Sequence, residues 1–413
     1  MGGHGIGSDF GELRLAGAGA TAPLAASLAA PVSAPAWDRF ARWPAAKARL
    51  AFLAFLALLV ASALVPIRAG QNTVETRDFF DNLAPAAPAG GETKRERDAD
   101  LALYDRAIER IQAGEHYYDF IVEEQRASNY PVNPGLAVRL PTLAYIDAAL
   151  GEGGQIAAAT LLLLATMLVW WRRLGEEPGG RRYRRLAMAF LFVGVSLGMN
   201  RYYFVLHELW TGMLLALSFG LHRTGANGQP GKWGASLAVA ALALAIREHA
   251  LPFVLLMAAF ALWRRNWREG MAWSALALAF LVALSIHLDI IAGQVLPSDR
   301  PSAPWLVMRG LSGWLSNVAL SSNLRFLPHW LAGPAIVVML LGWCGWRSPA
   351  GSFGALLFLG YGLAFMIAGR ADNFYWGAVI APAMFIGLAF VPRFLASLIE
   401  AAFPDKAGNA APK

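Results

Sequence analysis

The stretch WGASLAVAALALAIREHALPFVLLMAAFALW, residues 233 to 263, decides the fold class. Its two apolar runs meet at one charged corner, which consists of Arg247, Glu248 and His249. A helix rises 1.5 Å per residue and needs about 20 apolar residues to cross about 30 Å of hydrocarbon. Because each run is shorter than that, we expect helices that extend through the polar corner or meet there in a re-entrant turn. Charged groups at the edge of hydrocarbon are costly and usually functional.

The rest of the chain repeats this pattern. Of 413 residues, 57% are hydrophobic and only 15% are charged, which exceeds the apolar content of soluble domains. The sequence predicts an all-α polytopic membrane protein with about ten transmembrane helices. The expected spans are residues 49 to 67, 155 to 171, 186 to 200, 205 to 221, 233 to 247, 250 to 263, 271 to 292, 331 to 346, 353 to 369 and 376 to 395.

Basic clusters predict the orientation, since short loops rich in Lys and Arg stay in the cytoplasm. They fall on alternate connections: Arg39 to Arg49, Arg172 to Arg185, Arg223 with Lys232, Arg264 to Arg268, Arg347, and Arg393. Both termini are then cytoplasmic. The outer face receives the loop 68 to 155, the corners at 200 to 208, 246 to 250 and 370 to 375, and the loop 293 to 330.

Three regions follow from this layout. Residues 1 to 45 are expected to be a disordered cytoplasmic tail, residues 46 to 400 the transmembrane domain, and residues 401 to 413 a second tail. The first span lies far from the N-terminus and is long, which favours an uncleaved anchor over a cleaved signal. The net charge of +7 sits in short clusters between apolar runs, so no nucleic-acid partner is expected.

The outer loop 68 to 155 is the acidic part of the chain, with 15 acidic against 9 basic residues. Within it Leu101, Tyr104, Ile108 and Ile111 recur at helical spacing, and Gly114 follows as a stop. This pattern predicts an amphipathic helix on the outer membrane surface. A second surface helix is expected from Trp305 to about Leu320.

The outer loop also carries a resemblance to a known family. Its motif residues are Asp100-Leu101-Ala102-Leu103-Tyr104, Gly114, Tyr117-Tyr118-Asp119, Tyr130-Pro131-Val132-Asn133-Pro134 and Arg139-Leu140-Pro141. They resemble the first outer loop of the C-type (GT-C fold) glycosyltransferases that use polyprenyl-phosphate sugars. The nearest subgroup is the bacterial alpha-mannosyltransferase-like membrane proteins.

The resemblance implies a general base at Asp100, which would take the proton of an acceptor hydroxyl. Asp98, Asp78 and Asp81 are alternates, because related enzymes often carry the acid nearer the first span. Asp98 and Asp100 have a simpler explanation as well, since acids stabilise the positive N-terminus of a helix.

A departing lipid phosphate needs cationic ligands, and the planar fork of Arg suits it. Arg201, Arg247, Arg370 and Arg139 are the candidates, although an isolated interfacial Arg often only reaches toward lipid headgroups. The supporting polar residues are Tyr104, His207, Glu208, Glu248, His249, Asp289, Asp372 and Asn373. Their carboxylates either pair with the arginines or bind a divalent cation. No spacing makes a metal motif, so ion pairing is favoured and no cofactor is assigned.

The predicted function is transfer of a hexose, with mannose implied by the subgroup, from a polyprenyl-phosphate donor. The acceptor would be a cell-envelope glycan or lipid at the outer face of the bacterial inner membrane. Two alternatives stay open: a transporter or flippase of lipid-linked glycans, and a noncatalytic or polymerase component of surface-glycan assembly. A transporter should place charges near the bilayer midplane and show paired repeats.

Overall fold

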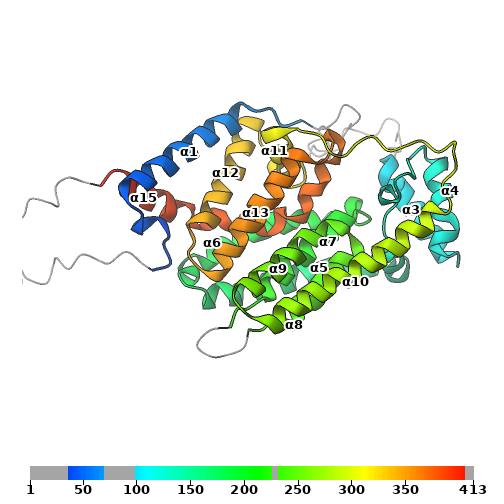
Figure 1. Ribbon diagram of the computed structural model, residues 1–413, viewed down its shortest axis with the longest axis horizontal. Helices are drawn as coiled ribbons and strands as arrows, with labels where there is room; N and C mark the ends of the chain where they lie inside the picture. Colours follow the sequence, from blue (N-terminus) through cyan, green and yellow to red (C-terminus); the bar gives the residue numbers. More distant parts are fainter. Residues whose placement is uncertain (1–35, 69–97, 226–230, 405–413) are drawn as a thin grey trace, which may run out of the picture. The chain divides into compact units, whose positions relative to one another are not determined.

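The computed structural model describes residues 36–68, 98–225 and 231–404, which form one compact unit. This part of the chain is all-helical, with fourteen α-helices, short 3-10 segments and no sheet (Figure 1). The α-helices are α1 (Ala45–Leu64), α3 (Ala99–Gln112), α4 (Tyr117–Ala127), α5 (Thr142–Glu176), α6 (Gly180–Ser196), α7 (His207–Leu221), α8 (Gly234–Ile246), α9 (Leu251–Trp263), α10 (Trp267–Ala292), α11 (Gly310–Leu320), α12 (His329–Gly345), α13 (Pro349–Ile367), α14 (Ala381–Met384) and α15 (Val391–Ala402). The 3-10 segments are η2 (Phe40–Arg42), η4 (Gly135–Ala137), η5 (Leu197–Met199), η6 (Arg201–Tyr203), η7 (Glu248–Ala250), η8 (Asn323–Phe326), η9 (Ala371–Val379) and η10 (Phe385–Phe390).

Five helical segments of the described chain are long and apolar enough to cross a membrane, which suggests a multi-pass membrane protein. They are Ala45–Leu64, Gly135–Glu176, Trp267–Ala292, Pro349–Ile367 and Ala381–Ala402. Each of the ten expected spans overlaps a helix, but α6, α7, α8, α9 and α12 are not among the five segments that are long and apolar enough to cross, and the last expected span is broken. That span is divided among η9, α14, η10 and α15.

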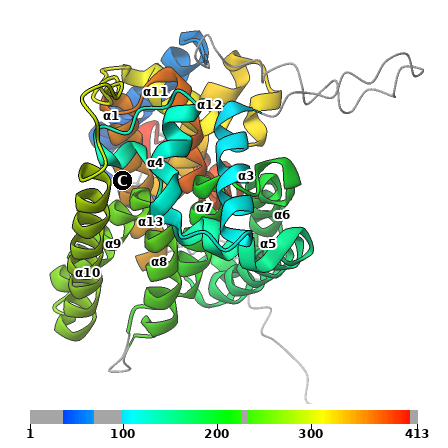
Figure 2. The same cartoon turned by 90° about the vertical axis from the view of Figure 1, so that its right-hand side faces the viewer.

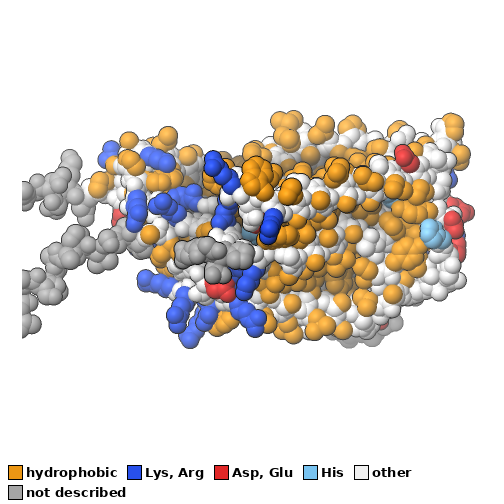
Figure 3. All heavy atoms as spheres, turned by 60° about the horizontal axis from the view of Figure 1, so that its bottom comes forward, with side chains coloured by type: hydrophobic (Ala, Val, Ile, Leu, Met, Phe, Trp, Pro, Cys, Tyr) orange, Lys and Arg blue, Asp and Glu red, His pale blue; other side chains and the backbone are white. Residues whose placement is uncertain are grey.

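The surface has the character of a protein in lipid. Large apolar side chains stand exposed along several long helices, for example Leu50 on α1 and Leu278 on α10. Figure 3 shows a broad apolar surface between two polar ends. Lys and Arg gather toward the end where α15 lies, and acidic side chains and a His mark the end where α3 and α4 lie. An exposed apolar surface of this extent would be unfavourable in water.

The helix predicted in the acidic loop is present as α3, but it does not stand apart from the helical body. It packs against α4 and α5 (Figure 2). This packing buries Leu101, Leu103 and Ala107. The loop itself is shorter than expected. Helix α5 begins at Thr142, well before the expected span at 155, and bends at Gly151, which has a φ of 59°. Residues 69–97 of the loop lie outside the described chain.

The second expected helix is present in part, but its predicted surface position is wrong. Helix α11 begins only at Gly310, and all its residues from Gly313 to Leu320 are buried against α13 and η9. Small residues make this possible: a Cβ on Gly313 would lie 2.3 Å from the Phe365 carbonyl oxygen. The Gly and Ser content that weakens a surface helix is what allows close helix packing.

The segment expected to be an N-terminal tail, residues 1 to 45, includes residues that pack on the helical body. Its residues 1 to 35 lie outside the described chain, but residues 37 to 43 pack on the helical body. The Asp38 carboxylate is fully buried, lies 2.7 Å from Arg393 Nε and accepts a hydrogen bond from Ser397. The backbone N–H of Arg39 donates to the Gly345 carbonyl at 2.9 Å. The C-terminal residues 405–413 lie outside the described chain.

Candidate functional site

One cavity of about 710 Å³ collects the polar corners of the sequence. Its walls come from α3, the segment 130–139, the α8–α9 junction, η8 and the start of η9. These elements lie far apart in the sequence. Figure 2 views the molecule from the end that carries α3 and α4, with α7 and α13 behind them.

Most of the predicted site residues line this cavity: Asp98, Asp100, Tyr104, Arg139, Arg247, Glu248, His249, Arg370, Asp372 and Asn373. His207 and Glu208 are buried behind its wall. Arg201 is absent from the lining, since its side chain is 61% exposed and pairs with Glu152. Asp289 lies exposed on α10. Asp78 and Asp81 fall outside the described residues.

Arg139 has an unusual environment among the cavity arginines. Its Nε donates to the Tyr104 hydroxyl at 2.9 Å, and its Nη2 donates to the Tyr375 hydroxyl at 3.2 Å. Asn373 Nδ2 also donates to the Tyr375 hydroxyl, at 3.3 Å. No carboxylate of the described residues forms an ion pair with Arg139. Burial raises the pKa of Tyr104, so this phenol stays neutral and does not balance the guanidinium charge. Glu208 and Glu248 act on Arg139 electrostatically but make no direct contact with it.

Asp100 lies in the first turn of α3, which begins at Ala99. The Tyr130 hydroxyl donates a hydrogen bond to Asp100 Oδ1. Burial and this contact raise the pKa of Tyr130, so the phenol keeps the proton that it donates. Asp100 and Tyr104 are four residues apart and lie on one face of α3. The carboxylate and the Arg139–Tyr104 pair are thus presented to the same cavity.

Arg247 belongs to a buried ion cluster at the junction of α8 with η7. Its Nε lies 2.7 Å from Glu208 Oε1, without hydrogen-bond geometry, and its Nη1 lies 2.9 Å from Glu248 Oε1. His249 Nδ1 lies 3.1 Å from the same Glu248 oxygen. Two carboxylates already balance the Arg247 charge, as expected for ion pairing, so this arginine is less available to an external anion than Arg139.

Arg370 is likewise partnered. Its Nε donates to Asp372 Oδ1 at 3.2 Å, and its Nη1 donates to the Ala303 carbonyl at 3.0 Å. Asn373 accepts from the backbone N–H of Arg370 at 3.1 Å and so fixes the start of η9. Four carboxylates were candidates for ion pairs with the arginines. Glu208, Glu248 and Asp372 form such pairs, whereas the exposed Asp289 does not.

The cavity contains residues that the sequence analysis did not place there. Arg325 on η8 lines it, with Nη1 3.5 Å from the Tyr203 hydroxyl. Arg325 stands between two apolar residues, as Arg139 does, and this shared pattern could have marked it. Tyr203, Trp305, Tyr375 and Trp376 also line the cavity, although their positions suggest an aromatic belt.

The described residues contain no group of three or more His, Cys, Asp or Glu side chains placed to hold a metal ion. The cavity is lined by four acidic residues, four arginines and several aromatic side chains. Two of the acidic residues, Glu248 and Asp372, pair with arginines of the lining. Such a lining suits a ligand with an anionic group and a sugar-like ring. Comparison with protein families, with curated proteins and with solved structures finds no match for this chain.

Proposed function

We propose that this protein is a membrane glycosyltransferase of the GT-C type, which transfers a hexose from a polyprenyl-phosphate donor to a cell-envelope acceptor. The single observation that carries the proposal is Arg139, a cation held by two phenols without a carboxylate partner, in the cavity that Asp100 also lines. A guanidinium at a cavity wall that no carboxylate contacts directly is a binding site for an anion such as phosphate.

The proposed roles follow from the charges. Arg139 binds the donor phosphate, and Tyr104 and Tyr375 orient its guanidinium. The aromatic faces of Trp305 and Trp376 contact the sugar or the first isoprene units. Asp100 takes the proton of the acceptor hydroxyl, whose oxygen then forms a bond to the anomeric carbon. The bond between that carbon and the phosphate oxygen breaks, and its electron pair leaves with the polyprenyl phosphate, where Arg139 stabilises the new charge.

The proposed topology has ten spans, cytoplasmic termini and a cavity that faces outward. The polarity of the surface supports it, because Lys and Arg gather at the end away from α3 and the cavity walls belong to the other end. The loop that carries Asp100 would then cover the outer face of a bacterial inner membrane.

A transfer assay tests the proposal. Purified protein in detergent micelles receives polyprenyl-phosphate mannose with a radiolabelled sugar and a lipid extract of the cell envelope as acceptor. We expect labelled acceptor and free polyprenyl phosphate in equal amounts, and Asp100→Asn should lower the rate at which both form by about 10² to 10⁴. If neither product forms although the donor binds, the transferase proposal fails.

One observation favours a transporter as the second candidate. The cluster of Arg247, Glu208 and Glu248 is buried where apolar helices meet, and buried charges of this kind occur in ion and substrate pathways. Donor bound in proteoliposomes and moved across the bilayer without cleavage of its phosphate bond would support this alternative.

A further inference from the structure

The turn between α5 and α6, at the end of the molecule away from the cavity, concentrates positive charge. Six arginines lie within the 14 residues from 172 to 185, and only Arg173 of these is buried. The other five are Arg172, Arg181, Arg182, Arg184 and Arg185. All except Arg184 are exposed. The Arg184 guanidinium lies 3.7 Å from the centre of the Trp171 ring, which holds it at the helix end.

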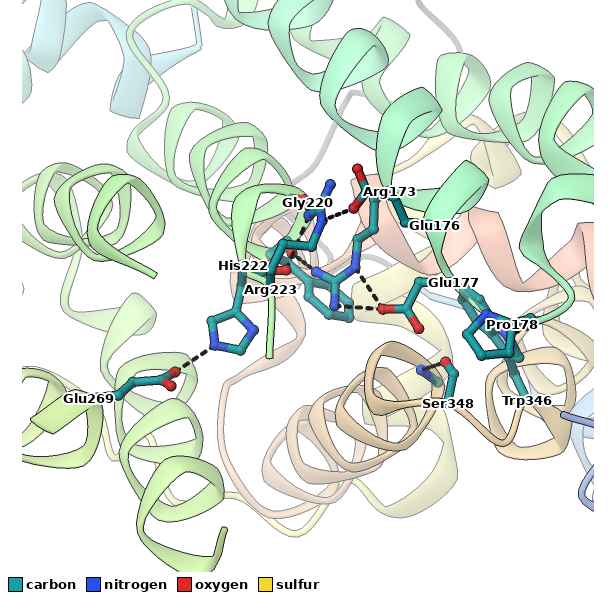
Figure 4. Close-up of polar contacts among 12 residues, drawn as sticks. Arg173, Glu176, Glu177, Pro178, Gly220, His222, Arg223, Glu269, Trp346 and Ser348 are labelled. Atoms are coloured by element: carbon teal, nitrogen blue, oxygen red, sulfur yellow. Dashed lines mark hydrogen bonds and ion pairs between the residues drawn. The ribbon is translucent and has the colours of Figure 1, made fainter. Parts of the chain in front are cut away.

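The two acids of the same turn do not neutralise these arginines. Glu177 Oε1 lies 3.3 Å from Nη2 of buried Arg173, and Glu176 pairs with Arg223 from the end of α7 (Figure 4). Arg173 is further fixed by a hydrogen bond to the Phe219 carbonyl. Both carboxylates are therefore committed to cations outside the set of five. Among the described residues, no carboxylate forms an ion pair with any of the five.

An apolar stripe leads along α5 to this cluster. Leu161, Leu164, Leu168 and Trp171 are all exposed, and their spacing of three or four residues places them on one face of the helix. The stripe ends at Arg172. A ligand that matches both the apolar stripe and the arginine cluster has an acyl chain along the stripe and an anionic headgroup at the arginines.

We propose that the α5–α6 turn is a binding site for an anionic phospholipid, whose phosphate contacts the five arginines and whose acyl chain lies on the Leu161–Trp171 stripe. A soluble anion would use the charges but not the stripe. The site lies on a different part of the molecule from the cavity and does not depend on the proposed transferase activity.

Native mass spectrometry tests the site with the full chain in micelles that contain equimolar phosphatidylglycerol and phosphatidylcholine. The wild type should retain phosphatidylglycerol in preference. A basic residue near an anionic surface contributes about 1 kcal/mol, so Arg181→Gln, Arg182→Gln and Arg185→Gln together should lower the preference at least about tenfold. The three Lys substitutions at the same positions keep the charge and should keep most of the preference.

The matched control removes three exposed arginines at the same end of the molecule, Arg264, Arg265 and Arg268 at the α9–α10 corner. An equal loss in this variant would overturn the assignment to the α5–α6 turn. Displacement of the lipid by inorganic phosphate alone would overturn the requirement for an acyl chain. A thermal unfolding curve for each variant separates lost binding from lost folding, since substitutions at exposed positions should leave the melting temperature nearly unchanged.

Discussion

Replacing Arg139 by Gln should weaken donor binding more than any other single loss of charge in the cavity. The substitution removes the guanidinium that donates to Tyr104 at 2.9 Å and to Tyr375 at 3.2 Å, and with it a cation that no described carboxylate contacts directly. A hydrogen bond to a charged group contributes about 1.5 to 3 kcal/mol. Affinity for polyprenyl phosphate should therefore fall roughly 10- to 100-fold.

The assay is titration of purified protein in micelles with polyprenyl phosphate, followed by intrinsic Trp fluorescence, because Trp305 and Trp376 line the cavity. Arg139→Lys keeps the charge but loses the planar guanidinium that contacts two phenols. Its affinity for polyprenyl phosphate should therefore lie between those of the wild type and Arg139→Gln. Arg201→Gln is the control, since Arg201 pairs with Glu152 and does not line the cavity. Unchanged affinity in Arg139→Gln at an unchanged melting temperature would refute the reasoning, as would an equal loss in the control.

Three further outcomes are expected. Asp100→Asn should lower the transfer rate by about 10² to 10⁴. The loss of a charge at the helix terminus should change the free energy of unfolding by no more than about 1 kcal/mol. A transfer rate close to that of the wild type would show that Asp100 is not the base. Gly342→Ala should destabilise the protein by about 1 to 3 kcal/mol in chemical denaturation, because the new Cβ would lie 1.9 Å from the Gly387 carbonyl oxygen; unaltered stability would contradict this close packing. The hydrogen bond from Arg126 lowers the pKa of Asp299. The pair therefore stabilises the fold fully above the usual Asp pKa of about 3.9. This stabilisation is lost as the pH falls through the lowered pKa of Asp299. Melting temperatures of the wild type should accordingly decline more steeply in acid than those of Asp299→Asn, and parallel curves would contradict the argument.

The class of fold could be predicted from the sequence because apolar length and the position of polar corners follow directly from the physics of lipid. Helices overlap every expected span, and the Arg247, Arg370 and Asp100 regions line one cavity. Such agreement arises because a polar corner between apolar helices has few other places where its charges are satisfied.

Side-chain direction at a corner could not be predicted. In the 3-10 turn η6, Tyr203 faces the cavity while Arg201, two residues earlier, points to Glu152. The phenol ligands of Arg139 come from positions 104 and 375, a pairing set by how η9 packs against α7 and α11. Sequence spacing carries no information about such long-range contacts.

Helix α11 shows the same limit for packing. Its Gly, Ser and Asn residues weaken the apolar pattern, which favours a surface position in the sequence. In the structure these small residues let neighbouring backbones approach, and the helix is buried. A weak apolar pattern in a membrane protein therefore indicates either exposure or close helix contact.

The central claim is that Arg139 and Asp100 face one bound donor. A cryo-electron microscopy structure with polyprenyl-phosphate mannose bound to the inactive Asp100→Asn protein tests it most directly. We expect phosphate oxygens within hydrogen-bond distance of the Arg139 guanidinium and the anomeric carbon on the side of residue 100. A phosphate bound elsewhere, with the Arg139 guanidinium still held by Tyr104 and Tyr375 alone, would contradict it.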